Sequence, residues 1–161
     1  MSEGVGTGAT EPADVTVRIQ RLPHLREIAL PAFATPEAAG ADIRAALEAP
    51  LTLAPGERAL VPTGFALALP PGWEAQVRPR SGLALRHGLS VVNTPGTVDS
   101  DYRGEVKVLL VNHGAEAVTL GRGERIAQMV VARVPRVCFQ EVDSLPESGR
   151  GAGGYGSTGT A

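Results

Sequence analysis

Apolar residues occur in short runs along most of this chain, and glycine or proline separates many of the runs. Residues 15–19 alternate apolar and polar positions with period two, which predicts a first strand. Beyond Pro55 the runs are rich in Val, Leu and Ile, residue types that favour strands. Further strands are predicted at residues 58–62, 65–69, 74–78, 89–92, 105–112, 118–120, 125–133 and 137–142. Many short strands at near-regular spacing are typical of an all-β sandwich, jelly roll or closed barrel.

Two segments carry helical signals. Residues 81–87 open with Ser81, a residue type that caps helix N-termini, and continue with apolar residues, so one short helix is predicted there. Residues 35–49 begin with Thr35 and a proline and continue with alanines, so local propensity predicts a second helix. Gly40 inside that segment weakens the second prediction.

A polar turn, residues 96–105, lies between two predicted strands and holds Asp99, Asp101 and Tyr102. Polar turns between β-branched runs are typical of hairpins. Glycines near both ends of the turn have no Cβ and let the backbone approach a flat ligand closely. A solvated acidic turn is the alternative interpretation of this stretch taken alone.

Three further polar clusters interrupt the apolar pattern. Arg80, Ser81 and Gly82 stand where a strand enters the predicted helix, and free backbone N–H groups, a hydroxyl and a guanidinium can face an anion there. Gln128 lies inside an otherwise apolar strand, so its amide must bond to a neighbour or a ligand. Asp42 is a single carboxylate among small apolar residues. Each cluster alone also has an ordinary structural explanation.

The glycine-rich segment 148–159 cannot form a core, and its composition favours a flexible tail. It also carries Arg150, Tyr155, Ser157 and Thr158. A lid over phosphates needs a cation, accessible backbone amides and hydroxyl donors, and this segment has all three. On this stretch alone, tail and lid are both open.

Composition narrows the class of protein. The 161 residues predict one domain, and an aromatic content of 4% predicts a core of Val, Leu, Ile and Ala. A net charge of −2 argues against general binding to nucleic acid or to anionic membranes. The one cysteine, Cys138, lies in a predicted strand and is expected to be a buried, inert thiol, which fits a cytoplasmic protein. No run is long enough to span a membrane, and residues 1–13 are expected to be a flexible lead-in without targeting features.

Five segments, in this order, resemble the five motifs of the trimeric deoxyuridine triphosphate nucleotidohydrolases, the dUTPases. They are residues 39–45, 79–84, 96–105, 123–129 and 150–159. Any one match would be weak, but five ordered matches over residues 15 to 159 are specific. The resemblance implies a jelly-roll-like distorted β-barrel with one short helix and a flexible C-terminal arm. It also implies a homotrimer with shared active sites, and it places the first motif in extended structure, against the local helical signal.

The resemblance further implies a division of the chain. Residues 1–13 would be the lead-in, residues 14–143 the β-barrel nucleotidohydrolase domain, and residues 144–161 an arm that closes over bound nucleotide as a lid. The implied reaction is Mg²⁺-dependent hydrolysis of dUTP to dUMP and pyrophosphate. That reaction limits uracil incorporation into DNA and supplies dUMP for thymidylate synthesis.

The polar turn would supply the chemistry and the selectivity. Asp99 matches the family's catalytic aspartate and would accept a proton from water attacking the α-phosphorus in line, whereas Asp101 would be structural. Tyr102 would pack against the deoxyribose and leave no room for a 2′-hydroxyl. The residues expected to pair with the uracil edge are Asn93, Gly96, Thr97 and Val98.

The remaining motifs would hold the triphosphate. The residues expected to bind phosphates are Arg80, Ser81, Gly82 and Gln128, with Arg150, Gly156, Ser157 and Thr158 closing over them. Tyr155 would stack on the uracil where the family most often has phenylalanine. Arg125 would order the fourth motif through an ion pair. Mg²⁺ would arrive on the triphosphate without a direct protein ligand, with Asp42 reaching it through water.

Two alternatives remain at this point. A deoxycytidine triphosphate deaminase would share the fold, but the turn with Asp99 and Tyr102 and the glycine-rich arm favour a dUTPase. A non-catalytic trimeric binding module would have lost the attacking base or the lid, and both are present in the sequence. No GxxxxGK[ST] loop occurs, which removes the commonest nucleotide-binding alternative.

Overall fold

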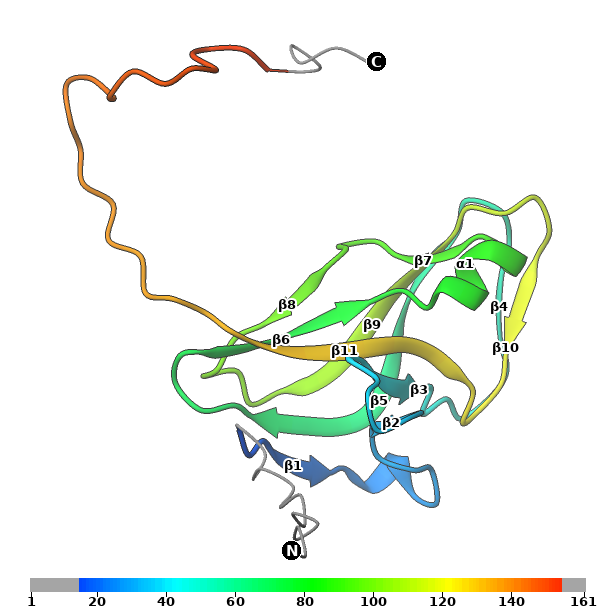
Figure 1. Cartoon of the computed structure of the whole chain (residues 1–161). Helices are drawn as coiled ribbons and strands as arrows, with labels where there is room; N and C mark the ends of the chain where they lie inside the picture. The colour runs from blue at the N-terminus through cyan, green and yellow to red at the C-terminus, as the bar shows by residue number, and fades with distance from the viewer. Residues whose placement is uncertain (1–14, 155–161) are drawn as a thin grey trace, which may run out of the picture.

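The computed structural model describes residues 15–154, and its regular elements are almost all antiparallel strands (Figure 1). The strands are β1 (Arg18–Arg21), β2 (Ala32–Phe33), β3 (Ala41–Arg44), β4 (Leu51–Leu53), β5 (Arg58–Ala68), β6 (Trp73–Arg78), β7 (Leu89–Val91), β8 (Gly96–Val98), β9 (Glu105–Asn112), β10 (Val118–Leu120) and β11 (Arg125–Arg133). The helices are the 3-10 turn η1 (Pro23–Leu25) and the α-helix α1 (Ser81–His87). No helix within residues 15–154 is long and apolar enough to cross a membrane.

Three sheets organise these strands. One has the order β1-β5-β9-β7, a second β2-β3-β11-β6-β8, and a small third sheet pairs β10 with β4. Within residues 15–154 the sheets do not close into a continuous barrel. The predicted all-β class with one short α-helix is confirmed.

Both larger sheets contribute to one apolar core. Most of its side chains are aliphatic, as the low aromatic content predicts. Its members include Ile43, Val77 and Ala127 from one sheet and Val61 and Leu110 from the other. Alternate residues of β9 are buried, the period-two pattern of a strand with one face on a core. Burial of aliphatic side chains therefore fixes which face of each strand turns inward.

Several predicted elements have the predicted bounds, namely α1, β9, β10 and β11. The predicted helix over residues 35–49 is wrong: the segment turns and then runs into β3, because Ala41 and Ile43 are buried as strand residues. Ser81 is not the helix cap, since the N-cap is Arg80 and no side chain bonds there. The first strand begins at Arg18, later than predicted.

The prediction of a strand at residues 137–142 is also wrong. The chain leaves the sheets after β11 as an extended segment (Figure 1), and Cys138, expected to be buried, is exposed. Phe139 is 94% exposed and Val137 67%. A β-strand needs a neighbouring edge to satisfy its backbone, and within residues 15–154 this segment has none.

The two strands predicted at 58–62 and 65–69 are one strand with a bulge. β5 pairs with β9 up to Pro62 and again from Ala66, so the register shifts between them. Gly64 lies in the bulge with a φ of +74°, a conformation that favours glycine. A Cβ on Gly64 would lie 2.6 Å from the Cβ of the buried Leu25, so η1 packs directly on the bulge.

Replacing Gly64 by alanine is expected to destabilise the fold. The left-handed backbone costs an alanine about 1 kcal/mol, and displacement of Leu25 adds about 1 to 3 kcal/mol. Gly56→Ala is the matched control, because Gly56 has a φ of +80° but nothing within 4 Å of its Cβ position. Urea unfolding at fixed protein concentration, followed by the fluorescence of Trp73, measures both variants. Equal losses in the two would contradict the close contact with Leu25.

Candidate active site

Asp42 joins three segments that are far apart in the sequence. Its carboxylate on β3 accepts a hydrogen bond from Arg80 Nε at 2.9 Å and another from Arg125 Nη1 at 3.0 Å. Arg80 precedes α1, and Arg125 begins β11. The Asp42 side chain is 17% exposed, so these are charge-assisted bonds at a partly buried position. The ion pair expected of Arg125 is present, and its partner is Asp42.

Gln128 fixes the chain just before Arg80. Its Nε2 donates to the carbonyl oxygen of Pro79 at 2.9 Å. On its other side, a Cβ on Gly40 would lie 2.3 Å from Oε1, so a larger residue at position 40 would displace the Gln128 amide. The polar residue inside an apolar strand thus orders its neighbours.

These segments surround a pocket of about 360 Å³. Its lining includes Asp42, Arg80, Ser81, Gly82 and Gln128. The structure therefore brings together all four residues predicted to hold the phosphates, and it adds the carboxylate that pairs with Arg80. We call these five residues the phosphate cluster.

The polar turn lies elsewhere in the fold. Its flanking strands β7 and β9 pair antiparallel, as predicted for a hairpin. The connection is longer than a tight turn, because it contains β8, which pairs with β6 in the other large sheet. Gly96 opens β8, and a Cβ there would lie 3.2 Å from the Nδ2 of Asn93. The turn thus links the two larger sheets.

Tyr102 is held by its own turn. Its N–H donates to the Asp99 carbonyl oxygen at 3.2 Å, and its hydroxyl donates to the backbone carbonyl oxygen of Glu105 at 3.1 Å. A Cβ on Gly104 would lie 2.4 Å from that hydroxyl, so the ring lies over the glycine. The ring is 46% exposed. Asp99 and Tyr102, with Thr97 and Val98, line a pocket of about 300 Å³.

The phosphate cluster and Asp99 lie toward opposite ends of β6. Along β8, Gly96 pairs with Val77 near the end of β6 and Val98 pairs with Ala75 near its start, and Arg80 follows the end of β6. Arg150 lies on the exposed arm, where its Nε donates to the Gly153 carbonyl oxygen at 2.8 Å. Tyr155, Gly156, Ser157 and Thr158 lie outside the described residues.

Comparison with known proteins decides the family. The dUTPase family model matches residues 26–159. The chain belongs to the dUTPase family. Its enzyme class within that family is dUTP diphosphatase.

Solved structures agree in fold. Two are of Staphylococcus bacteriophage 80alpha dUTPase with dUpNHpp, one of them a mutant, with TM-scores of 0.81 and identities of 22% and 23%. Each comparison covers 90% of this chain and 99% of the phage chain. A mutant dUTPase from phage phi11 of S. aureus, described with a structural Mg(II) ion, has a TM-score of 0.72 at 19% identity. That comparison covers 82% of this chain and 99% of the phage chain.

Two residues of this dUTPase-family chain escaped sequence reasoning. The sequence places Glu105 at the end of the third motif, and no local pattern marks His24. In the structure, Oε1 of Glu105 lies 2.7 Å from Nε2 of His24. The same oxygen accepts the N–H groups of Thr63 at 3.2 Å and Gly64 at 2.8 Å. The available signal was an acidic residue at the first position of a largely apolar strand.

Burial of the Glu105 carboxylate acts to raise its pKa, but the other contacts outweigh it. Hydrogen bonds from His24 and from the Gly64 N–H, together with the charges of His24 and Lys107, hold the pKa of Glu105 below its ordinary value of 4.5. Lys107 Nζ lies 3.7 Å from the other carboxylate oxygen. The charged form of Glu105 is therefore the form that the fold stabilises.

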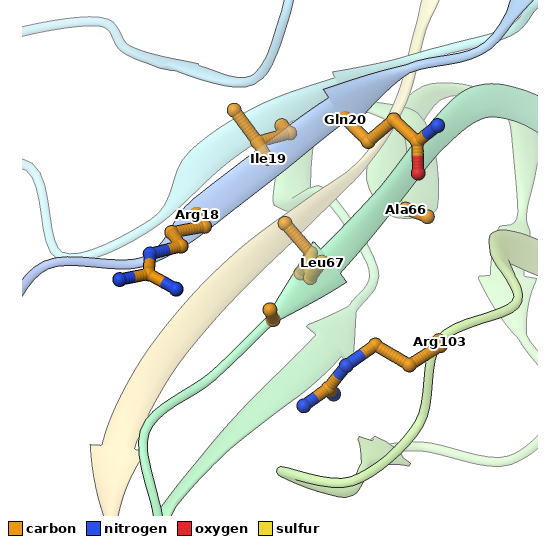
Figure 2. A pocket seen from close by; sticks show the side chains of 7 residues that line it. Arg18, Ile19, Gln20, Ala66, Leu67 and Arg103 are labelled. Carbon is orange, nitrogen blue, oxygen red and sulfur yellow. The ribbon is translucent and has the colours of Figure 1, made fainter.

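Other hollows surround the turn. A pocket of about 170 Å³ is lined by residues of β1 and β5 and by Arg103 of the turn (Figure 2). Arg103 Nη1 donates to the carbonyl oxygens of Ser100 and Tyr102, at 2.7 and 2.8 Å, and so fastens the turn to itself. A larger hollow of about 700 Å³ includes Asp99 and Trp73. Among residues 15–154, no group of three His, Cys, Asp or Glu side chains could hold a metal ion.

The pKa of Glu105 generates a pH prediction. Because its folded pKa lies below 4.5, its stabilising contribution is fully present above that pH and is lost as the pH falls through the folded pKa. Glu105→Gln is expected to cost about 1 kcal/mol at about pH 7, the difference between charged and neutral hydrogen bonds. The gap to wild type should shrink below about pH 4.5. Urea unfolding across this pH range measures it.

Glu116→Gln serves as the control, since Glu116 is exposed on the loop before β10. We expect its stability to follow wild type at each pH. A gap between wild type and Glu105→Gln that stays constant down to about pH 3 would contradict the charged pairing of Glu105.

Proposed function

We propose that this chain hydrolyses dUTP to dUMP and pyrophosphate, with water attacking the α-phosphorus in line with the leaving pyrophosphate. The observation that carries the proposal is the phosphate cluster, in which the first, second and fourth motifs meet around one pocket. A guanidinium at Arg80, the backbone at the start of α1 and the amide of Gln128 suit a polyanion. The reaction would limit uracil in DNA and supply dUMP for thymidylate synthesis.

Asp99 is the proposed general base. Its side chain is exposed and lines the same pocket as Tyr102, so attacking water can reach it beside a bound sugar. A carboxylate there takes the proton as the water oxygen bonds to phosphorus. The ring of Tyr102, fixed by its bond to Glu105, would pack on the deoxyribose and exclude a 2′-hydroxyl. Asn93 and the backbone of β8 would pair with the uracil edge.

Mg²⁺ is the expected cofactor. The carboxylate of Asp42 already accepts bonds from two arginines, so a metal would meet it only through water. Mg²⁺ bound to triphosphate oxygens would neutralise charge on the phosphates and the leaving group. The bond from Arg80 to Asp42 also holds Arg80 in place at the pocket, where its charge would face the phosphates.

We further propose a homotrimer in which each site draws on more than one copy. Val98, the neighbour of Asp99, pairs with Ala75, and Arg80 lies five residues beyond Ala75 along β6 and its exit, roughly 17 Å at strand spacing. Proton transfer at the α-phosphorus requires contacts of about 3 Å, so one chain cannot offer both groups to one phosphate. A symmetric assembly can place the turn of one copy against the phosphate cluster of another.

The arm fits the same arrangement. Residues 133–152 are all exposed, and the apolar side chains of Val137, Phe139 and Leu145 are among them. Such residues are normally covered, and another copy of the chain would cover them. We propose that residues 14–143 form the hydrolase domain behind a lead-in of residues 1–13, and that residues 144–161 close as the lid. A cytoplasmic location is part of this proposal.

The first experiment follows pyrophosphate release from dUTP, dTTP, UTP and dCTP with Mg²⁺. We expect release from dUTP and little from the others. Asp99→Asn should lower kcat by at least about a thousandfold while dUTP still binds, because the general base is lost and the phosphate cluster is intact. Ammonia from dCTP would favour a deaminase, and dUTP binding without turnover by wild type would favour a binding module.

The shared site can be tested by mixing two inactive chains. Asp99→Asn and Arg80→Ala are unfolded together in equal amounts and refolded. Each site needs an intact turn from one copy and an intact cluster from another, so about one quarter of wild-type activity should return. The same variants refolded separately and then combined without exchange should stay inactive. Absence of recovery in the co-refolded trimer would mean that a single chain supplies both groups.

A further inference from the structure

The carboxylate of Glu105 contacts residues outside its own strand, in β5 and η1. Its carboxylate fills the bulge of β5, where it accepts the N–H groups of Thr63 and Gly64. The side chain is 14% exposed. These two backbone donors, with Lys107 nearby, already compensate the buried charge. His24 is an additional donor, at the shortest of the three distances to Oε1.

Hydrogen bonds from two arginines hold the backbone around His24 in place. Arg122 donates from Nη2 to the carbonyl oxygens of His24 and Leu25, at 2.9 and 3.1 Å. Arg21 Nη1 donates to the carbonyl oxygens of Arg26 and Ile28 just beyond. Leu25 itself is 1% exposed and lies against Gly64. The backbone that carries the imidazole is therefore held in place, and the bond between His24 and Glu105 ties the carboxylate to it.

The position of Tyr102 depends directly on that of Glu105. The hydroxyl of Tyr102 donates to the backbone carbonyl oxygen of Glu105, 3.1 Å away. The ring lies over Gly104, the residue immediately before Glu105. A shift of Glu105 in the bulge would thus move both the carbonyl that holds the hydroxyl and the surface under the ring. The exposed face of the ring is the one that the proposed function places against the sugar.

We propose that His24 is a positioning residue for sugar discrimination: through Glu105 it holds Tyr102 where the ring excludes a 2′-hydroxyl. The inference rests on the proposed function, since it concerns the choice between dUTP and UTP in that reaction. His24 touches no reacting atom. Without His24, the ring of Tyr102 is held less firmly. The reaction with UTP should then rise more than the reaction with dUTP falls.

The test measures the ratio of kcat/KM for dUTP to kcat/KM for UTP. In His24→Ala the ratio should fall about fivefold to tenfold, the size expected when one ordinary hydrogen bond is lost. His24→Asn should match it, because the shorter amide does not reach Oε1. His24→Gln places an amide nitrogen near the position of Nε2 and should restore the ratio to within about twofold of wild type. The two amide variants keep the test decisive if His24→Ala does not fold.

His113→Ala is the matched control, because it removes another imidazole from an exposed position between β9 and β10. We expect this variant to keep the wild-type ratio, even if its unfolding temperature falls. A purely structural role for His24 would lower stability and the active fraction but leave the ratio unchanged.

The outcomes separate the two proposals. If wild type discriminates between dUTP and UTP and all His24 variants keep the wild-type ratio, the positioning role is overturned and the proposed function stands. If wild type releases no pyrophosphate from dUTP, the proposed function fails and the role of His24 falls with it.

Discussion

The carboxylate of Asp42 is the interaction on which the architecture of the phosphate cluster depends. Arg80 and Arg125 converge on it from the entrance of α1 and the start of β11. Two guanidinium groups that lie close together repel one another, and the Asp42 carboxylate between them makes their proximity favourable. The same carboxylate ties β3 to segments that lie about 40 and 80 residues further along the chain, so the first, second and fourth motifs depend on one charged group.

A second carboxylate does comparable work at the turn. Glu105 satisfies the backbone of a bulge that would otherwise leave N–H groups buried without partners. Its own backbone holds Tyr102. Acidic residues therefore shape the site at both ends of β6, each in a structural role beside the proposed chemical role of Asp99.

The fold of one chain separates groups that the proposed reaction must bring together. The register of β8 on β6 sends Asp99 away from Arg80, and the arm beyond β11 exposes Phe139 and its apolar neighbours. The proposed assembly of identical copies would account for both features. Covering the arm and completing the site would then be a single event, which couples association to activity.

Some features of this protein are encoded by neighbouring residues along the chain. β9 has the predicted bounds because its burial alternates with period two, runs of strand-favouring residues predicted β10 and β11, and the ordered motifs of Asp42, Arg80, Asp99 and Gln128 identify the family. Sequence reasoning failed where a partner decides the outcome. Residues 137–142 have strand propensity but no edge to pair with, and the alanines after Thr35 were overridden by burial of Ala41 and Ile43 in a sheet.

The contacts between charged side chains depend on the packing of elements that are far apart in the sequence. Nothing in the local sequence links His24 to Glu105, 81 residues away. Their contact depends on the bulge at Gly64 and on the packing of Leu25 against it. Propensity and periodicity are properties of neighbouring residues, whereas a contact between η1 and β9 depends on how separate elements pack. The sequence therefore determined the strands and the family, and packing determined how the residues of the site are held.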